Sequence, residues 1–151
     1  MKIALGCDHG GFLLMQEVKK FLEEKGYEYK DFGAYSTERA HYPVHGEAAA
    51  RAVASGECDA GIVICTTGIG ISISANKVDG IRCALCGDCY SAEMTRRHNN
   101  ANVLALGANV VGQGLALKIV EKFLTTDFES NEERHVYRVN LMMDIENRHK
   151  I

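Results

Sequence analysis

Short apolar segments alternate with segments of helical periodicity along the whole chain, and this alternation limits the possible folds. The strand-like segments cover residues 2–5, 27–32, 60–64, 81–85 and 102–105. The helical patterns cover residues 12–26, 46–54, 90–98 and 115–124. Strands separated by helices pair in parallel, and strands that are apolar on both faces need helices on both sides. The alternation therefore predicts a three-layer, Rossmann-like α/β fold with a five-stranded parallel sheet.

The size and charge of the chain favour one domain that acts on small molecules. A length of 151 residues suits a single domain over residues 1–151. A net charge of −3 without runs of like charge argues against nucleic-acid binding, and no apolar stretch is long enough to span a bilayer. The N-terminal apolar segment is too short for a signal peptide, so we expect a cytoplasmic protein.

The C-terminal segment, residues 131–151, is polar but carries spaced apolar residues. These apolar residues are Val136, Val139, Leu141, Met142 and Ile145. Because no strand follows them, we expect an amphipathic helix that buries one face on its own domain or on a second copy of the chain.

Six cysteines occur in the chain, and we expect all of them to be free thiols because a cytosolic domain of this size does not need disulfides. Cys83, Cys86 and Cys89 have a spacing that resembles part of a metal-ligand set. No second Cys/His pair stands at a matching distance, and Cys83 and Cys86 fall in or beside an expected strand. We therefore interpret these three residues as small buried side chains and expect no metal.

Cys65 stands where an apolar strand gives way to a glycine-bearing turn and the start of a helix. The free N–H groups and positive dipole end of a helix N-terminus stabilise a thiolate and bind an anion beside it. A cysteine phosphatase needs an arginine six residues after the cysteine, and this chain has Ile71 there. Cys65 is thus a candidate base beside an oxyanion site formed by residues 66–70, or a buried side chain without chemistry.

Asp8 and His9 follow the first strand, at the sheet edge where ligands bind in such folds. Asp8 either faces the ligand or only caps the helix that begins near Phe12. His98 ends a polar helix, where it either stabilises the helix terminus or acts as an acid and base.

Arg134, His135 and Arg138 lie on one side of the expected C-terminal helix. A solvated charged face is the ordinary explanation for such a set. An arginine pair one turn apart also fits a phosphate group.

Together, six segments resemble the B type of ribose-5-phosphate isomerase, whose superfamily includes the subunits of galactose-6-phosphate isomerase. The resemblance covers nearly the whole chain and is carried by residues 6–11, Tyr42-Pro43, residues 65–72, residues 75–77, His98-Asn99, and Arg134-His135-x-x-Arg138.

The resemblance implies a cofactor-free and metal-free aldose-ketose isomerase of the pentose phosphate pathway. It interconverts ribose 5-phosphate and ribulose 5-phosphate through a cis-enediolate, with Cys65 as the base. His98 opens the sugar ring, Thr67 is a further catalytic group, and the backbone of Thr66, Gly68, Ile69 and Gly70 holds the oxyanion. Asp8, His9, Tyr42 and Asn99 contact the sugar. The resemblance also implies a homodimer, with tetramers left open, in which the C-terminal helix packs on the partner subunit and Arg134 and Arg138 bind phosphate at the neighbouring site.

Two positions depart from the family pattern. Thr66 stands where the family usually has glycine, and Asn109 stands where it usually has a phosphate-binding arginine. Loss of one charge-assisted hydrogen bond costs about 2 kcal/mol of binding unless another group replaces it. Two alternatives therefore stay open: an isomerase of allose or galactose 6-phosphate, and a sugar-phosphate-binding module without turnover.

Overall fold

The computed structural model describes residues 1–148 and 150, and over this range the chain forms a single five-stranded sheet. The strands are β1 (Lys2–Cys7), β2 (Glu28–Asp31), β3 (Ala60–Cys65), β4 (Cys83–Leu85) and β5 (Val103–Gly107). Their order is β2-β1-β3-β5-β4, and every neighbouring pair is parallel. The predicted five-stranded parallel sheet is therefore confirmed.

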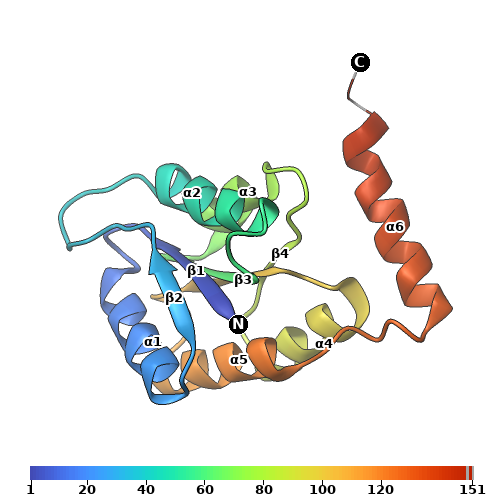
Figure 1. The fold of residues 1–151 in the computed structure, drawn as a ribbon. Helices are drawn as coiled ribbons and strands as arrows, with labels where there is room; N and C mark the ends of the chain where they lie inside the picture. Colours follow the sequence, from blue (N-terminus) through green and yellow to red (C-terminus); the bar gives the residue numbers. More distant parts are fainter. Residues whose placement is uncertain (149, 151) are drawn as a thin grey trace.

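Helices cover both faces of this sheet (Figure 1). They are α1 (Phe12–Glu24), α2 (Tyr42–Ala54), α3 (Ile69–Asn76), α4 (Cys89–Asn99), α5 (Gln113–Thr125) and α6 (Glu133–Arg148). The helices α2 and α3 pack on one face, whereas α1, α4 and α5 pack on the other. This arrangement is the three-layer α/β architecture that the sequence predicts.

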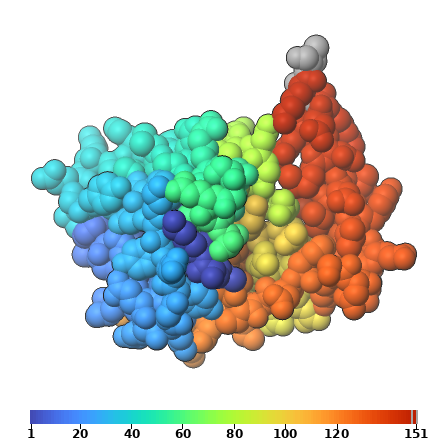
Figure 2. All heavy atoms as spheres, in the orientation of Figure 1, coloured from blue at the N-terminus to red at the C-terminus, as the bar shows by residue number. Residues whose placement is uncertain are grey.

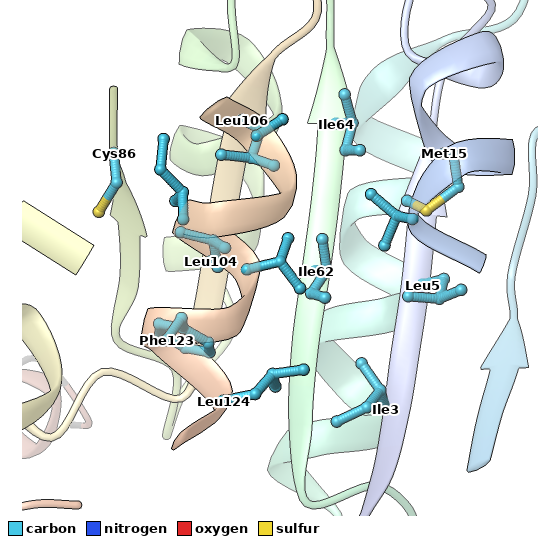
Figure 3. Packing of buried hydrophobic residues seen from close by; sticks show 14 of the residues in the cluster. Ile3, Leu5, Met15, Ile62, Ile64, Cys86, Leu104, Leu106, Phe123 and Leu124 are labelled. Atoms are coloured by element: carbon cyan, nitrogen blue, oxygen red, sulfur yellow. The ribbon is translucent and has the colours of Figure 1, made fainter. Parts of the chain in front are cut away.

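The strand residues alternate between two separate apolar clusters. Figure 3 shows Ile62 and Ile64 of β3 beside Leu104 of β5 and Phe123 of α5. The intervening residue Val63, like Cys65 at the end of the same strand, belongs to the cluster under α2 and α3. Because successive side chains of a strand point to opposite faces, this register places the Cys65 thiol beneath α3.

Most element boundaries lie within one or two residues of the expected ones, and the starts of two elements differ for identifiable reasons. The helix α2 begins at Tyr42 rather than at residue 46, because Pro43 lies in its first turn, where a missing N–H costs nothing. The strand β4 begins at Cys83 rather than at residue 81. The backbone N–H of Arg82 donates to the Asn102 side chain instead of to the sheet, at 2.8 Å.

The C-terminal helix α6 stands along one side of the body, with a hollow between it and the segment that joins α3 to β4, which is yellow-green in Figure 2. His135 and Val139 are buried against its own chain, but Leu141 and Ile145 are exposed. Gly80 N–H donates to the Glu146 carboxylate at 3.0 Å and ties the far end of α6 to the body. Across the described residues, none of the helices has both the length and the apolar character to cross a membrane.

Candidate active site

An open pocket of about 540 Å³ lies at the carboxyl ends of β1 and β3. Parallel α/β sheets bind their ligands at this edge. Its lining residues come from three chain segments, and they are Asp8, Tyr42, Cys65, Thr66, Thr67, Ile69, Gly70 and Ile73. Seven of these eight residues are candidate site residues from the sequence, so the structure brings this part of the expected site together.

The Cys65 thiol lies at the start of α3, where a backbone N–H group reaches it. Gly68 N–H donates to Cys65 Sγ at 3.1 Å, and only 4% of Cys65 is exposed. Gly68 has a positive φ of 77°, and a Cβ there would lie 2.5 Å from Leu85 Cδ1. Only glycine is accommodated easily at this position, so the turn aims an N–H group at the sulfur. The sulfur therefore lies within reach of a backbone donor at the start of the helix.

The first turn of α3 supplies further donors beside the thiol. Ile69 N–H donates to Thr67 Oγ1 at 3.2 Å, which orders the turn before the helix. The next N–H group, that of Gly70, belongs to the first helical turn, where intrahelical acceptors are missing. An oxyanion bound here would meet the Gly70 N–H group and the positive end of the helix dipole.

Asp8 lines the pocket from the end of β1, whereas the next residue, His9, is not among the lining residues. Asp8 is 5% exposed, and its Oδ1 accepts a hydrogen bond from Gly11 N–H at 3.0 Å. Gly11 is itself the N-cap residue of α1, so Asp8 orders the turn before the helix and also lines the pocket. His9 is exposed, and its Nδ1 lies 3.1 Å from the Ala40 carbonyl oxygen.

Tyr42 lines the pocket, whereas Asn109 is not a lining residue but contacts the backbone of Thr66. A Cβ on Gly70 would fall 2.6 Å from the Tyr42 ring, so the ring packs directly on the first turn of α3. The backbone N–H of Asn109 donates to the Thr66 carbonyl oxygen at 3.0 Å, and its side chain is exposed. An exposed amide can donate hydrogen bonds to a phosphate, but it carries no charge.

A second polar cluster joins α4 to α6. The rings of His98 and His135 stack with centroids 4.4 Å apart and planes inclined by 15°. His135 Nε2 lies 3.1 Å from Glu129 Oε2, at a geometry that does not make a hydrogen bond. Arg97 Nε donates to Glu129 Oε1 at 2.7 Å and, with smaller effects from both histidines, lowers the pKa of Glu129. Sequence reasoning missed Glu129, because it precedes α6 in a loop without any periodic pattern.

This histidine and carboxylate cluster offers a metal ion poor geometry. The ligand atoms of His98, Glu129 and His135 lie within 4.8 Å of one another. Nearly parallel rings cannot point their nitrogen atoms at one common ion, and Glu129 already pairs with Arg97. The arrangement suits proton transfer better than metal binding.

Within one chain, the Cys65 pocket and the cluster of His98, Glu129 and His135 lie at opposite ends of the strands, the pocket at the carboxyl ends and the cluster at the amino ends. The helix α4 follows β4 and runs back for 11 residues, so its ends lie about 16 Å apart. It leads into β5, whose first residue Val103 pairs with Gly61, at the opposite end of β3 from Cys65. His98 and Asn99 therefore lie away from the Cys65 pocket of their own chain. Asn99 instead lines a groove of about 430 Å³ that Met142 and Ile145 of α6 also line.

Arg134 and Arg138 are both exposed on α6, one turn apart. Arg134 lies 3.6 Å from Glu132, and both side chains of this pair are largely solvent-exposed. A surface pair of this kind contributes little to stability. The two arginines are therefore available to an anion outside their own chain.

The three cysteines with metal-like spacing lie at the β4 edge. Cys83 is in β4, Cys86 follows it directly, and Cys89 begins α4. Burial raises the pKa of Cys83 to about 12 and that of Cys86 to about 11. Both thiols are therefore protonated at neutral pH in the metal-free protein.

The fold and the pocket together define an α/β protein with a thiol and helix N–H donors positioned for proton transfer beside an oxyanion. A family model described as ribose/galactose isomerase matches residues 3–142. The chain therefore belongs to the ribose/galactose isomerase family.

Individual relatives cover most of the chain. Ribose-5-phosphate isomerase B of Escherichia coli is 50% identical over 147 residues, 97% of each chain. Galactose-6-phosphate isomerase subunit LacB of Clostridium acetobutylicum is 44% identical over 133 residues, 88% of this chain and 77% of the relative. The structure of ribose-5-phosphate isomerase B from Clostridium thermocellum has a TM-score of 0.96 and 52% identity, covering 99% of this chain and 100% of the other.

Proposed function

We propose that the protein is a cofactor-free isomerase that interconverts ribose 5-phosphate and ribulose 5-phosphate, a step of the pentose phosphate pathway. The observation that carries this proposal is the Cys65 thiol, hydrogen-bonded by Gly68 N–H and lining an open pocket with Asp8. The names of the relatives from Escherichia coli and Clostridium thermocellum support ribose 5-phosphate as the substrate.

Cys65 acts as the base in this reaction. Its thiolate removes the proton from C2 of the open-chain aldose, and the C2–H electron pair forms the enediolate double bond as C1–O gains negative charge. The N–H groups at the start of α3 bind this oxyanion. The proton of the C2 hydroxyl passes to O1, the thiol returns its proton to C1, and the electron pair left on O2 forms the C2 carbonyl, which yields the ketose and restores the thiolate. Thr67 supports the step because its Oγ1 orders the turn that presents these donors.

His98 opens the furanose ring by donating a proton to the ring oxygen, and it does so at the site of a second subunit. Within one chain, His98 and Cys65 lie at opposite ends of the strands. His135 stacks on His98 and approaches Glu129, so this cluster holds the ring and balances its charge. In a homodimer, the His98 side of one subunit faces the Cys65 pocket of the other, and this arrangement completes both sites.

Exposed apolar side chains support this dimer. Ile69 and Ile73 of α3 are 53% and 54% exposed at the pocket rim. On α6, Leu141 and Ile145 are exposed as well. Contiguous apolar surface beside a polar pocket is typical of an interface between subunits. We propose that a second copy of the chain covers both surfaces.

In this proposal, the arginines of α6 bind the phosphate group of the substrate. Arg134 and Arg138 are exposed one turn apart and reach the partner's pocket in the proposed dimer. A guanidinium binds phosphate through two parallel hydrogen bonds, and Asn109 at the pocket edge adds neutral donors. His9, Tyr42 and Asn99 contact the sugar hydroxyls.

The test measures kcat/KM of the purified protein on ribose 5-phosphate, allose 6-phosphate and galactose 6-phosphate. We expect ribose 5-phosphate to have the highest value, and Cys65→Ala to abolish turnover while substrate binding survives. Cys58→Ala is the matched control, because Cys58 is buried just before the other end of β3. Near-normal turnover by Cys65→Ala would refute the base, and binding without turnover by the unmodified chain would favour a non-catalytic module.

A hexose 6-phosphate is the second candidate substrate. The name of the LacB relative and the uncharged side chain of Asn109 favour it. A higher kcat/KM on allose or galactose 6-phosphate than on ribose 5-phosphate would select this reading and leave the chemistry of Cys65 unchanged.

A further inference from the structure

Gly10 and Thr66 interlock on the Asp8 side of the pocket. A Cβ on Gly10 would lie 2.2 Å from Thr66 Oγ1 and 3.4 Å from Asp8 Oδ1. The Thr66 hydroxyl thus fills the space that any larger residue at position 10 would need. The two residues belong to the loops after β1 and β3, and their contact forms a wall beside the Asp8 carboxylate.

The backbone around Thr66 is tied down on both sides. Its carbonyl oxygen accepts from Asn109 N–H at 3.0 Å, and the Cys65 carbonyl oxygen accepts from Ala108 N–H at 2.9 Å. Asp8 N–H donates to the Ile64 carbonyl oxygen at 3.2 Å. Threonine also has few χ1 rotamers, since it is β-branched. The wall is therefore rigid, and a substrate has to fit it.

The wall lies directly beside the reacting end of the substrate. Thr66 follows the base Cys65, so C1 and C2 of a bound sugar lie next to it. In the proposed dimer, α6 of the partner subunit holds the phosphate at the other end. A six-carbon sugar has one more CH–OH group between these two fixed ends than a five-carbon sugar. Because both ends are fixed, the added group needs room along the pocket walls, one of which carries Thr66.

We propose that Thr66, seated on Gly10, is the residue that makes this pocket select five-carbon over six-carbon sugar phosphates. The inference rests on the proposed isomerase function and names the specificity of the same site. A pocket distinguishes substrates that differ by one carbon by about 10- to 200-fold in kcat/KM. Loss of the Thr66 side chain removes most of that difference, because the wall then ends at the Gly10 backbone.

The experiment compares kcat/KM on ribose 5-phosphate and allose 6-phosphate for the unmodified protein and the variants Thr66→Gly, Thr66→Val, Gly10→Ala and the double variant. We expect Thr66→Gly to raise the ratio of allose to ribose activity by about tenfold or more. Thr66→Val keeps the shape of the side chain without its hydroxyl, so we expect the ratio of the unmodified protein. Each ratio is internal to one variant, so a partly unfolded preparation does not change it.

The Gly10 variants test the interlock itself. Gly10→Ala places a methyl group against Thr66 and lowers ribose 5-phosphate turnover, whereas adding Thr66→Gly removes the clash and restores part of it. A Thr66→Gly ratio within about twofold of the unmodified protein, or Gly10→Ala turnover that Thr66→Gly does not improve, overturns the inference while the isomerase function stands. Failure of the unmodified protein on every sugar overturns the proposed function, and this inference with it.

Discussion

Mixed dimers test whether each site draws Cys65 from one subunit and His98 from the other. Cys65→Ala removes the base, and His98→Asn removes the ring-opening acid while keeping a polar side chain. In a dimer of the two variants, one site lacks both groups and the other has both. The opposite positions of these residues in the sheet require this outcome if the dimer is as proposed.

The expected activity follows from counting sites. Equal amounts of two subunits that pair at random give about half mixed dimers, each with one complete site of two, so the mixture recovers about one quarter of the unmodified activity. Mixed dimers purified through two different affinity tags recover about one half. The assay is ketose formation from ribose 5-phosphate, measured against each variant alone, because spontaneous ring opening leaves His98→Asn some background.

A reciprocal pairing provides the control with the opposite expectation. A subunit carrying both substitutions is combined with an unmodified subunit. If the sites are shared, neither site of this mixed dimer is complete, and its activity falls to background. If each site lies within one chain, this dimer keeps about half of the activity, and the first pairing recovers nothing. That pair of results would refute the shared site.

Three further predictions concern single positions. Arg138→Ala raises KM for ribose 5-phosphate by about 10- to 100-fold, because one charge-assisted hydrogen bond to the phosphate is lost, and changes kcat little. Arg148→Ala, at the far end of α6, is the control. A loss confined to kcat argues against phosphate binding by Arg138. Burial raises the pKa of Cys83 to about 12 and that of Cys86 to about 11, so both thiols stay protonated at pH 8. We therefore expect peptide mass spectrometry to find neither thiol alkylated when the native protein is treated with iodoacetamide. Alkylation as fast as in denaturant contradicts this assignment. Gly68→Ala forces a side chain into positive φ and against neighbouring backbone, which destabilises the fold by about 1 to 3 kcal/mol; an unchanged denaturation midpoint shows that the turn relaxes.

Several parts of the site could be predicted because they depend on neighbours in the sequence. An apolar strand followed by a glycine turn and a helix places Cys65 at a helix N-terminus wherever the strand lies in the sheet. Asp8 follows the first strand for the same reason. The start of α2 at Tyr42 was predicted wrongly, because residues 42–45 show no apolar helical period and only Pro43 marks the first turn.

Contacts between distant segments had no such local signal. Thr66 meets Gly10 across the loops after β3 and β1, and Arg97 of α4 donates to Glu129 in the loop before α6. Neither contact follows from periodicity or spacing, since it depends on how whole elements pack.

The sequence by itself determined the order of strands and helices, the parallel sheet and the place of Cys65 at the end of β3, because hydrophobic periodicity and turn residues act locally. Only the tertiary structure decided which candidate residues meet. The strand order and the direction of α4, which runs antiparallel to the strands, place His98 at the amino ends of the strands, whereas Cys65 lies at the carboxyl end. A chain of this fold therefore cannot close the distance between the two groups within one subunit, and the proposed reaction needs a second copy.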